Sequence, residues 1–263
     1  NFIYHMNIFI TGGTGFIGSH LVEFLLKKKY NVYVLAEYSF EHSKGWLKNT
    51  KNKKLKIIFG DIKDSSTYEN YFKKCDIVIN LAALISIPYS YNAVKSYLQT
   101  NLIGTYNLLE LSRRYKIKKF IQTSTSEVYG NPKYLPIDEN HPLQSSSPYA
   151  ATKASADQLC LSYYFSYKLP LIIIRPFNTF GPRQSLRAVI PTIILQSIFK
   201  KKISLGKVDT RRDFTFVDDT VNGFFKAFSL NKKYFGTTIN LGTGKSFKIS
   251  DIIKIIESKL DKK

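Results

Sequence analysis

The sequence predicts an α/β fold in which helices cover both faces of a parallel sheet, and three observations support this. Short, nearly continuous apolar runs alternate with helix-length segments through residues 7–175. A glycine-rich turn joins the first run to the first helical segment. After Pro176, turn signals surround shorter elements. Because strands that are apolar throughout are buried on both sides, and crossovers are right-handed, the favoured arrangement is a doubly wound, Rossmann-like sheet with a smaller C-terminal lobe.

Six strands and five helices are expected, in alternation. The strands are short and rich in β-branched residues, and they cover residues 7–10, 32–35, 57–60, 77–81, 120–124 and 171–175. The helices that follow them cover residues 16–29, 65–73, 92–115 and 148–167. A last, amphipathic helix is expected at residues 251–260.

These elements divide the chain into two predicted domains. Residues 6–178 form a cofactor-binding domain of the Rossmann kind, and residues 212–241 are expected to pack back onto it. Residues 179–211 and 242–263 form a substrate-binding lobe, which is small enough that we expect it to be incomplete. Residues 1–5 are interpreted as upstream sequence.

Composition places the chain among globular proteins. It has 263 residues, of which 44% are hydrophobic and 22% charged. No apolar run reaches the ~18 residues of a membrane span, and we expect no membrane association. Cys75 and Cys160 show no pairing pattern, which favours a reducing, cytoplasmic location. The histidines are scattered and predict no metal site: His5, His20, His42 and His141.

The net charge of +20 raises the question of nucleic-acid binding. Nucleic-acid surfaces concentrate arginine beside aromatic residues, whereas only seven of the 39 basic residues here are Arg. The lysines are spread along the whole chain. We therefore expect no specific nucleic-acid partner, only a general attraction for anionic ligands.

The glycine-rich segment TGGTGFIG follows the first strand at residues 11–18. Its glycines fit both GxGxxG and GxxGxxG spacing. Such glycines allow a tight turn and let backbone N–H groups approach a pyrophosphate, which the positive end of the next helix also attracts. A purely structural turn has the same pattern, but the position favours dinucleotide binding. The candidate contacts are Gly12, Thr14, Gly15, Phe16, Ile17 and Gly18.

An acidic residue ends the second strand. Glu37 lies about twenty residues after Gly18, where a carboxylate binds the hydroxyls of the adenosine ribose and disfavours a 2′-phosphate. No Arg or Lys occupies the strand end. The cofactor is therefore predicted to be NAD rather than NADP, although Glu37 also fits a solvated loop carboxylate.

Tyr149 and Lys153 are one turn apart at the start of an expected helix. Beside a nicotinamide, a lysine ammonium and the cationic ring would lower the pKa of the tyrosine and allow it to take a hydroxyl proton. The strand upstream ends in TSTSEVYG at residues 123–130. Since the carboxyl ends of strands face the ligand crevice, its hydroxyls and Glu127 are expected near Tyr149.

Together, TGGTGFIGSH, Tyr149-x-x-x-Lys153 and TSTSEVYG resemble the extended short-chain dehydrogenase/reductase family of NAD-dependent nucleotide-sugar epimerases and dehydratases. The likeness extends over the whole chain, through GDI at 60–62, NLAA at 80–83, RPFN at 175–178 and NLG at 240–242. It implies that Asp61 and Ile62 hold adenine. The other cofactor contacts that it implies are Leu81, Ala82, Ala83, Thr123, Tyr149, Lys153 and Pro176.

The resemblance also implies a nucleotide-diphosphate sugar substrate and a homodimer. Residues around the sugar nucleotide would be Thr125, Asn178, Arg183, Val189, Arg212 and Asn240, with the arginines placed for the diphosphate. The helices near 92–115 and 148–167 would pair across the dimer as a four-helix bundle. Apolar residues on them are Leu98, Leu102, Leu109, Leu159, Leu161 and Tyr164.

The triplet Thr125-Ser126-Glu127 resembles the 4,6-dehydratase form of the family, since epimerases carry no acid there. Three longer segments are similar to N-acetylglucosamine 4,6-dehydratases of legionaminic-acid-type pathways, which supply cell-surface polysaccharides. They are LAALISIPYSY, PIDENHPLQ and AVIPTII. The resemblance implies that UDP- or GDP-N-acetylglucosamine becomes a 4-keto-6-deoxy sugar, although dTDP also stays open.

In that reaction Tyr149, supported by Lys153, takes the C4 hydroxyl proton and Thr125 binds the same oxygen. Glu127 removes the C5 proton before water leaves C6, and Ser126 relays a proton. Glu127 also fits a structural carboxylate that caps the following turn. Two alternative functions stay open: an NAD-dependent 4-epimerase, and a non-catalytic NAD- or nucleic-acid-binding protein.

Overall fold

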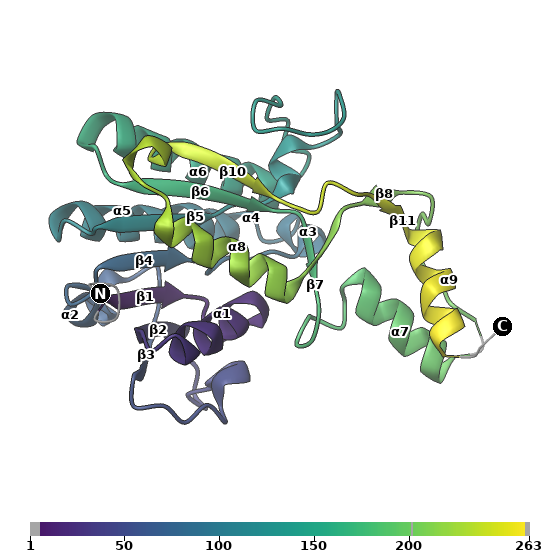
Figure 1. Cartoon of the computed structure of the whole chain (residues 1–263), viewed down its shortest axis with the longest axis horizontal. Coiled ribbons are helices and arrows are strands. Elements are labelled where there is room, and N and C mark those ends of the chain that lie inside the picture. Colours follow the sequence, from purple (N-terminus) through teal and green to yellow (C-terminus); the bar gives the residue numbers. More distant parts are fainter. Residues whose placement is uncertain (1–5, 201, 261–263) are drawn as a thin grey trace.

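The computed structural model describes residues 6–200 and 202–260, so the interpretation of residues 1–5 falls outside it. A seven-stranded parallel sheet forms the centre of the molecule (Figure 1). Its strands are β1 (Asn7–Thr11), β2 (Asn31–Glu37), β3 (Leu55–Gly60), β4 (Ile77–Asn80), β5 (Lys119–Thr123), β6 (Leu171–Pro176) and β10 (Thr237–Leu241). They run in the order β10-β6-β5-β4-β1-β2-β3. This order confirms the predicted doubly wound, Rossmann-like sheet.

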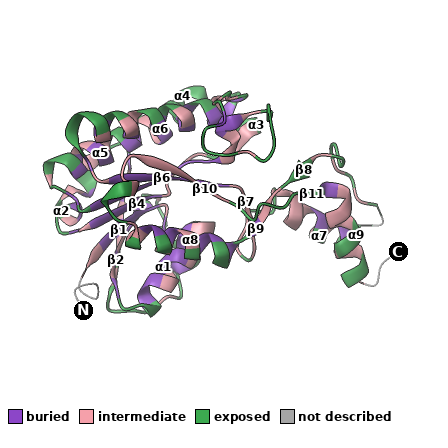
Figure 2. Ribbon diagram, turned by 45° about the horizontal axis from the view of Figure 1, so that its top comes forward, coloured by how far each residue is buried: buried purple, intermediate pink, exposed green. Residues whose placement is uncertain are grey.

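Helices cover both faces of the sheet (Figures 1 and 2). One face packs against α1 (Phe16–Lys27) and α8 (Val217–Ser229). The other packs against α2 (Glu69–Phe72), α5 (Gly104–Arg114) and α6 (Pro148–Tyr167).

The strand sequences explain this two-sided burial. Ile8 and Ile10 of β1 lie in the core beside α1, whereas Phe9 between them lies in the core beside α5. All three side chains are fully buried. The absence of polar alternation in the strands is therefore the signature of a sheet that needs a helical layer on each side.

Two of the expected helices are broken. The segment expected as one helix at residues 92–115 consists of α4 (Val94–Tyr97), a π-helix (Leu98–Ile103) and α5, and α3 (Ile87–Ser90) precedes it. The segment 65–73 is a 3₁₀ turn (Ser65–Thr67) followed by α2. Apolar spacing predicts a helical face but not a local change in hydrogen-bond register, which is why periodicity missed both breaks.

After β6 the chain leaves the sheet to form a smaller unit. It first makes β7 (Asn178–Phe180), which pairs with β9 (Phe214–Phe216). We call the elements beyond this pair the small lobe. They are α7 (Val189–Phe199), β8 (Arg211–Arg212), β11 (Phe247–Lys248) and α9 (Ile249–Lys259). Figure 2 shows α7 and α9 side by side, away from the sheet.

Between β9 and β11 the chain returns to the sheet through α8 and β10. β10 pairs with β6, and α8 packs beside α1. The ammonium of Lys119, at the start of β5, donates hydrogen bonds to the carbonyls of Ala227, Phe228 and Leu230. Because the last carbonyls of a helix have no partner within it, this buried lysine fastens the end of α8 to the sheet.

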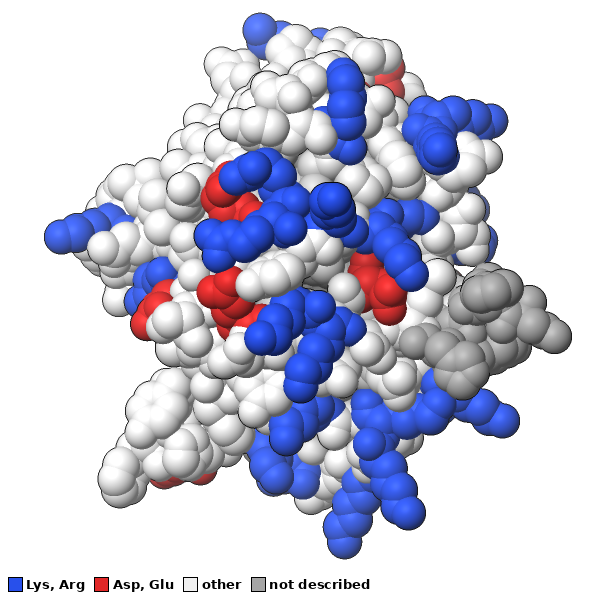
Figure 3. All heavy atoms as spheres, turned by 90° about the vertical axis from the view of Figure 1, so that its left-hand side faces the viewer, with Lys and Arg blue, Asp and Glu red and all other residues white. Residues whose placement is uncertain are grey.

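The positive charge is spread over the surface. Figure 3 shows lysines and arginines, with carboxylates between them, across the end of the molecule opposite the small lobe. Exposed pairs such as Lys118–Asp76 and Arg114–Glu69 account for part of this pattern. Within residues 6–200 and 202–260, no helix is long and apolar enough to span a membrane.

Candidate active site

The glycine-rich turn between β1 and α1 forms a cradle of bare backbone. A Cβ on Gly18 would lie 2.2 Å from the carbonyl oxygen of Gly12, and one on Gly12 (φ +67°) would lie 2.8 Å from the amide of Ala82. These contacts close the turn tightly. At Gly15, by contrast, a Cβ would meet only the Gly12 oxygen, at 3.4 Å.

The start of α1 is ready for an anion. Gly15 occupies its N-cap position and supplies no side-chain cap, and the first turn contains no acidic residue. The N–H groups of that turn therefore have no side chain to bind, and the helix dipole favours negative charge there. A pyrophosphate fits this arrangement, which places candidates Thr14, Phe16 and Ile17 beside it.

The end of β4 adjoins the same turn. The hydroxyl of Thr11 donates to Oδ1 of Asn80 at 2.6 Å and accepts from the amide of Ala82 at 3.1 Å. This bond ties the strand ends of β1 and β4 together. It leaves Leu81, Ala82 and Ala83 partly exposed in the segment that follows β4.

The candidates for the adenosine half differ in exposure. Glu37 is exposed at the carboxyl end of β2, next to Gly60 in the sheet register. Asp61 is partly exposed and pairs with Lys63. Ile62 is 7% exposed, and its side chain fills the space beside Gly104. Glu37 and Asp61 are therefore the side chains that a ligand can reach here.

The start of α6 presents Tyr149. Ser147 caps the helix by accepting from the amide of Ala150 at 3.1 Å, and Pro148 fits the first helical position. Tyr149 therefore lies in the first turn and Lys153 one turn later, where its ammonium reaches the end of β5. The two side chains are 7% and 3% exposed.

Residues after β5 surround the Tyr149 phenol. Thr125 hydrogen-bonds to it, while the carboxylate of Glu127 acts on it electrostatically. The Thr125 hydroxyl also accepts from the amide of Glu127 at 3.2 Å and starts a 3₁₀ turn, Ser126–Tyr129. The structure thus places Thr125 and Glu127 in the turn directly after β5, and both influence the pKa of the Tyr149 phenol.

Burial raises the pKa of Tyr149 to about 12, and the Thr125 hydrogen bond opposes this only in part. The prediction that Lys153 lowers this pKa concerns the complex with the cofactor. There the cationic ring and the Lys153 ammonium together would have to overcome the effect of burial.

Lys153 is anchored by the backbone of β5. Its ammonium donates to the carbonyl of Thr123 at 2.6 Å, and burial lowers its pKa. The hydroxyl of Thr123 is itself buried and has no hydrogen-bond partner among the described residues. An unsatisfied donor at the carboxyl end of β5 is a group that a bound dinucleotide could satisfy.

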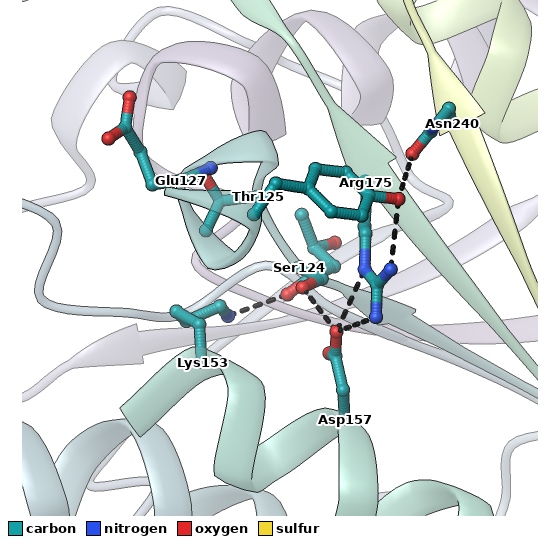
Figure 4. A network of polar contacts seen from close by, with 9 residues as sticks. Ser124, Thr125, Glu127, Lys153, Asp157, Arg175 and Asn240 are labelled. Carbon is teal, nitrogen blue, oxygen red and sulfur yellow. Dashed lines mark hydrogen bonds and ion pairs between the residues drawn. The ribbon is translucent and has the colours of Figure 1, made fainter. Parts of the chain in front are cut away.

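A buried polar network behind Lys153 is absent from the sequence predictions (Figure 4). Oδ2 of Asp157 accepts from Ser124 at 2.7 Å and from Nε and Nη2 of Arg175 at 3.1 and 3.0 Å. Arg175 also donates to the hydroxyl of Tyr129 at 2.9 Å, and that hydroxyl donates to Asn240 at 2.7 Å. The network joins α6, β6, the turn after β5, and β10.

Two signals in the sequence point to this network. Arg175 interrupts an otherwise apolar strand, and Asp157 lies one turn beyond Lys153 on the same helix. A further missed residue is Asn101 in the π-helix, which binds both backbone groups of Leu84 and the hydroxyl of Thr152. It holds the segment after β4 against α6.

The residues predicted to bind the substrate do not form one cluster, unlike those around Tyr149 and Lys153. Asn240 is engaged by Tyr129, and its amide donates to the carbonyl of Ile137. Arg183 makes two bonds to Glu23 and one to Ser19 on α1, so its guanidinium is already occupied. The others lie in β7, at the start of α7, and in the exposed strand β8: Asn178, Val189 and Arg212.

Comparisons with known proteins agree with this geometry. The family model described as "GDP-mannose 4,6 dehydratase" matches residues 9–263. A dTDP-D-glucose 4,6-dehydratase of Dictyostelium discoideum is 36% identical over 95% of the chain, which spans 61% of that relative's length.

Two solved structures superpose closely. DesIV of Streptomyces venezuelae, a dTDP-glucose 4,6-dehydratase crystallised with NAD, has a TM-score of 0.90 at 27% identity, covering 98% of this chain and 82% of that one. A UDP-N-acetylglucosamine 4-epimerase of Methanobrevibacter ruminantium has a TM-score of 0.89 at 32% identity, covering 98% and 83%. Both dehydratases and epimerases are thus among the similar proteins.

Proposed function

The chain belongs to the extended short-chain dehydrogenase/reductase family of NAD-dependent nucleotide-sugar epimerases and dehydratases, and from that premise we propose that it is a nucleotide-sugar 4,6-dehydratase. The observation that carries this choice is Glu127. It lies in the turn that Thr125 starts directly after β5, and its charge contributes to raising the pKa of Tyr149. A base in that place suits the removal of a second proton from the sugar.

Cofactor binding is supported by three groups of the protein. The bare backbone around Gly15, the uncapped start of α1 and the unsatisfied Thr123 hydroxyl all suit a dinucleotide. Glu37 at the end of β2 suits the hydroxyls of an unphosphorylated ribose. When bound, NAD supplies a reversible acceptor for a hydride from the sugar.

The side chains have separate tasks in the proposed reaction. Tyr149 takes the proton from the C4 hydroxyl, and Thr125 holds the same oxygen. Lys153, fixed by the Thr123 carbonyl, keeps a positive charge near the phenol and the ribose. Glu127 then removes the proton at C5, which the neighbouring C4 ketone has made acidic, and the C6 hydroxyl takes up a proton and leaves as water. The C5–C6 double bond would regain the hydride from C4 at C6 and a solvent proton at C5, which gives the 4-keto-6-deoxy sugar. The hydroxyl of Ser126 relays a proton but is too weak an acid to replace Glu127.

We propose UDP- or GDP-N-acetylglucosamine as the substrate. The support is the resemblance of the longer sequence segments, together with a similar epimerase that acts on a UDP-N-acetyl sugar. Exposed arginines of the small lobe, Arg187 and Arg212, suit a diphosphate. The charge of Arg187 also acts on Tyr97, whose ring packs edge-on against Tyr149.

A homodimer and a cytoplasmic location complete the proposal. Side chains of the π-helix, α5 and α6 leave apolar surface exposed, and these are Leu98, Ile103, Tyr106, Phe165 and Tyr167. Leu109, another apolar residue of these helices, is fully buried in the core and leaves no surface for a partner. Elution as a monomer at micromolar concentration would contradict the dimer.

The test is mass spectrometry of UDP-N-acetylglucosamine after incubation with the protein and NAD in deuterated water. Loss of one water with gain of one solvent deuterium is expected, because the C5 proton exchanges during elimination. GDP- and dTDP-sugars are run in parallel.

A product of unchanged mass without deuterium, separable by chromatography, would instead indicate the 4-epimerase. This is the second candidate, and the similar Methanobrevibacter epimerase favours it. No product from any of the three nucleotides would contradict both activities.

A further inference from the structure

Asp157 is the only acidic side chain in the described core that lies between two buried cations. It is 0% exposed, while Lys153 and Arg175 are each 3% exposed. Lys153 lies one helical turn before it on α6, and Arg175 reaches it from β6. Charges in such a site interact strongly because little water screens them.

The two oxygens of the Asp157 carboxylate are used unequally. Oδ2 accepts three hydrogen bonds, one from Ser124 and two from Arg175. Oδ1 is buried and has no hydrogen-bond partner among the described residues. The ion pair with Arg175 therefore leaves one carboxylate oxygen of Asp157 without a hydrogen bond.

Asp157 is linked to Lys153 by a second route. Ser124, which it binds, follows Thr123 in the chain, and the Thr123 carbonyl accepts from the Lys153 ammonium at 2.6 Å. One carboxylate thus both compensates the charge of the lysine and fixes the strand end that orients it. Figure 4 shows Lys153, Ser124 and Asp157 converging there, with Glu127 directed away.

We propose that Asp157 is a positioning residue that keeps Lys153 charged and aimed at the bound cofactor. The proposal rests on the role given to Lys153 above. A simpler reading is that Asp157 serves only to neutralise Arg175, and the experiment separates the two.

Other titratable groups near this site come from several elements. Cys160 and Tyr149 lie on α6, and Tyr129 and Glu127 lie in the turn after β5. Burial lowers the pKa of Lys153, and Asp157 is the largest influence opposing it, ahead of Cys160. The loss of the Asp157 charge should therefore lower the pKa of Lys153 further.

The test is NADH binding, followed by fluorescence from pH 6 to 11 without any sugar, so that it stands even if no nucleotide sugar is converted. Wild-type affinity should fall about tenfold as Lys153 loses its proton at high pH. Lys153→Met should abolish this pH dependence. Asp157→Asn should move the midpoint down by about one pH unit or more, whereas Ser124→Ala, which keeps the charge, should weaken binding without moving it.

The double variant Asp157→Asn/Arg175→Gln guards against misfolding, because it removes both charges of the pair and leaves amides that can hydrogen-bond. Its thermal stability should exceed that of Asp157→Asn. Its midpoint should lie above that of Asp157→Asn, because loss of the Arg175 cation raises the pKa of Lys153. An Asp157→Asn midpoint equal to that of wild type, or a wild-type affinity that does not change with pH, would overturn the proposal.

Discussion

The cofactor half of the molecule and the small lobe are built on different principles. Around the ends of β5 and β6, polar side chains are buried and bind one another, as Lys153, Asp157 and Arg175 do. In the small lobe, strands are only two residues long and Arg212 is exposed. A part of the ligand that never changes favours a site fixed in advance, whereas a sugar nucleotide that differs between relatives favours an adaptable surface. Substitutions in the first region should therefore abolish stability, cofactor binding or turnover. Substitutions in the small lobe should change substrate affinity by degrees.

The largest difference is expected between two glycines. Gly18→Ala places a methyl group 2.2 Å from the Gly12 oxygen, where only backbone could move. We expect a loss of about 3 kcal/mol or more of unfolding free energy and no measurable NADH binding. Gly206→Ala in the small lobe meets nothing within 4 Å and should be neutral. Thermal unfolding and NADH titration of the two variants measure stability and binding. Equal melting temperatures for Gly18→Ala and Gly206→Ala would contradict the expected difference between the two regions.

Next in size is the phenol at the start of α6. Tyr149→Phe removes the proton acceptor and should lower kcat about 10²- to 10⁴-fold, with NADH affinity within about twofold of wild type. Tyr167→Phe, at the exposed end of the same helix, is the control and should have no effect. Steady-state kinetics measure this effect. A kcat of Tyr149→Phe within tenfold of the wild-type kcat would exclude the phenol as the base.

Glu127 should affect one step only. Glu127→Gln should bind NADH normally, because the carboxylate belongs to the turn after β5 and not to the cofactor cradle. Dehydration should slow about 10²- to 10⁴-fold, and Ser126→Ala much less. The deuterium incorporation described above is the readout. Full turnover of Glu127→Gln would reduce this residue to a cap of its own turn.

The smallest effect should come from the small lobe. Arg212→Ala should raise KM about tenfold and leave kcat unchanged if its guanidinium binds the diphosphate of the proposed substrate. Lys118→Ala is the control, since it removes an exposed ion pair with Asp76 at the start of β5. A fall in kcat for Arg212→Ala would mean that the lobe orders the reacting sugar as well as binding it.

The sheet could be predicted because its strands are apolar on both faces, and such strands require helices on each side. Ile8, Phe9 and Ile10 display this directly. β10 was not recognised as the seventh strand, because its five residues TTINL are only partly buried at the edge beside β6. The π-helix was missed since hydrogen bonding by Asn101, not apolar spacing, marks it.

The candidate site could be predicted where residues are neighbours along the chain, or where parallel strands end at the same edge of the sheet. Tyr149 and Lys153 share a helix, and Thr125 and Glu127 share a turn, so their positions follow from local rules. The contact of Asp157 with Arg175 joins residues from a helix and a strand, and that of Tyr129 with Asn240 spans 111 positions. Such pairs depend on the packing of whole elements. The same limit applies to Arg183, whose partner Glu23 lies 160 positions earlier.

The route of the chain has one more consequence, for how such proteins diversify. The backbone leaves the sheet after β6 and re-enters it at α8, with Lys119 fastening the last turn of that helix. The segment between these points contributes α7 and β8 to the small lobe, and β11 and α9, which follow β10, complete it. Loops in such a position can lengthen, shorten or exchange at little thermodynamic expense. A lineage could thus inherit its redox machinery unchanged while it acquires new sugars one insertion at a time.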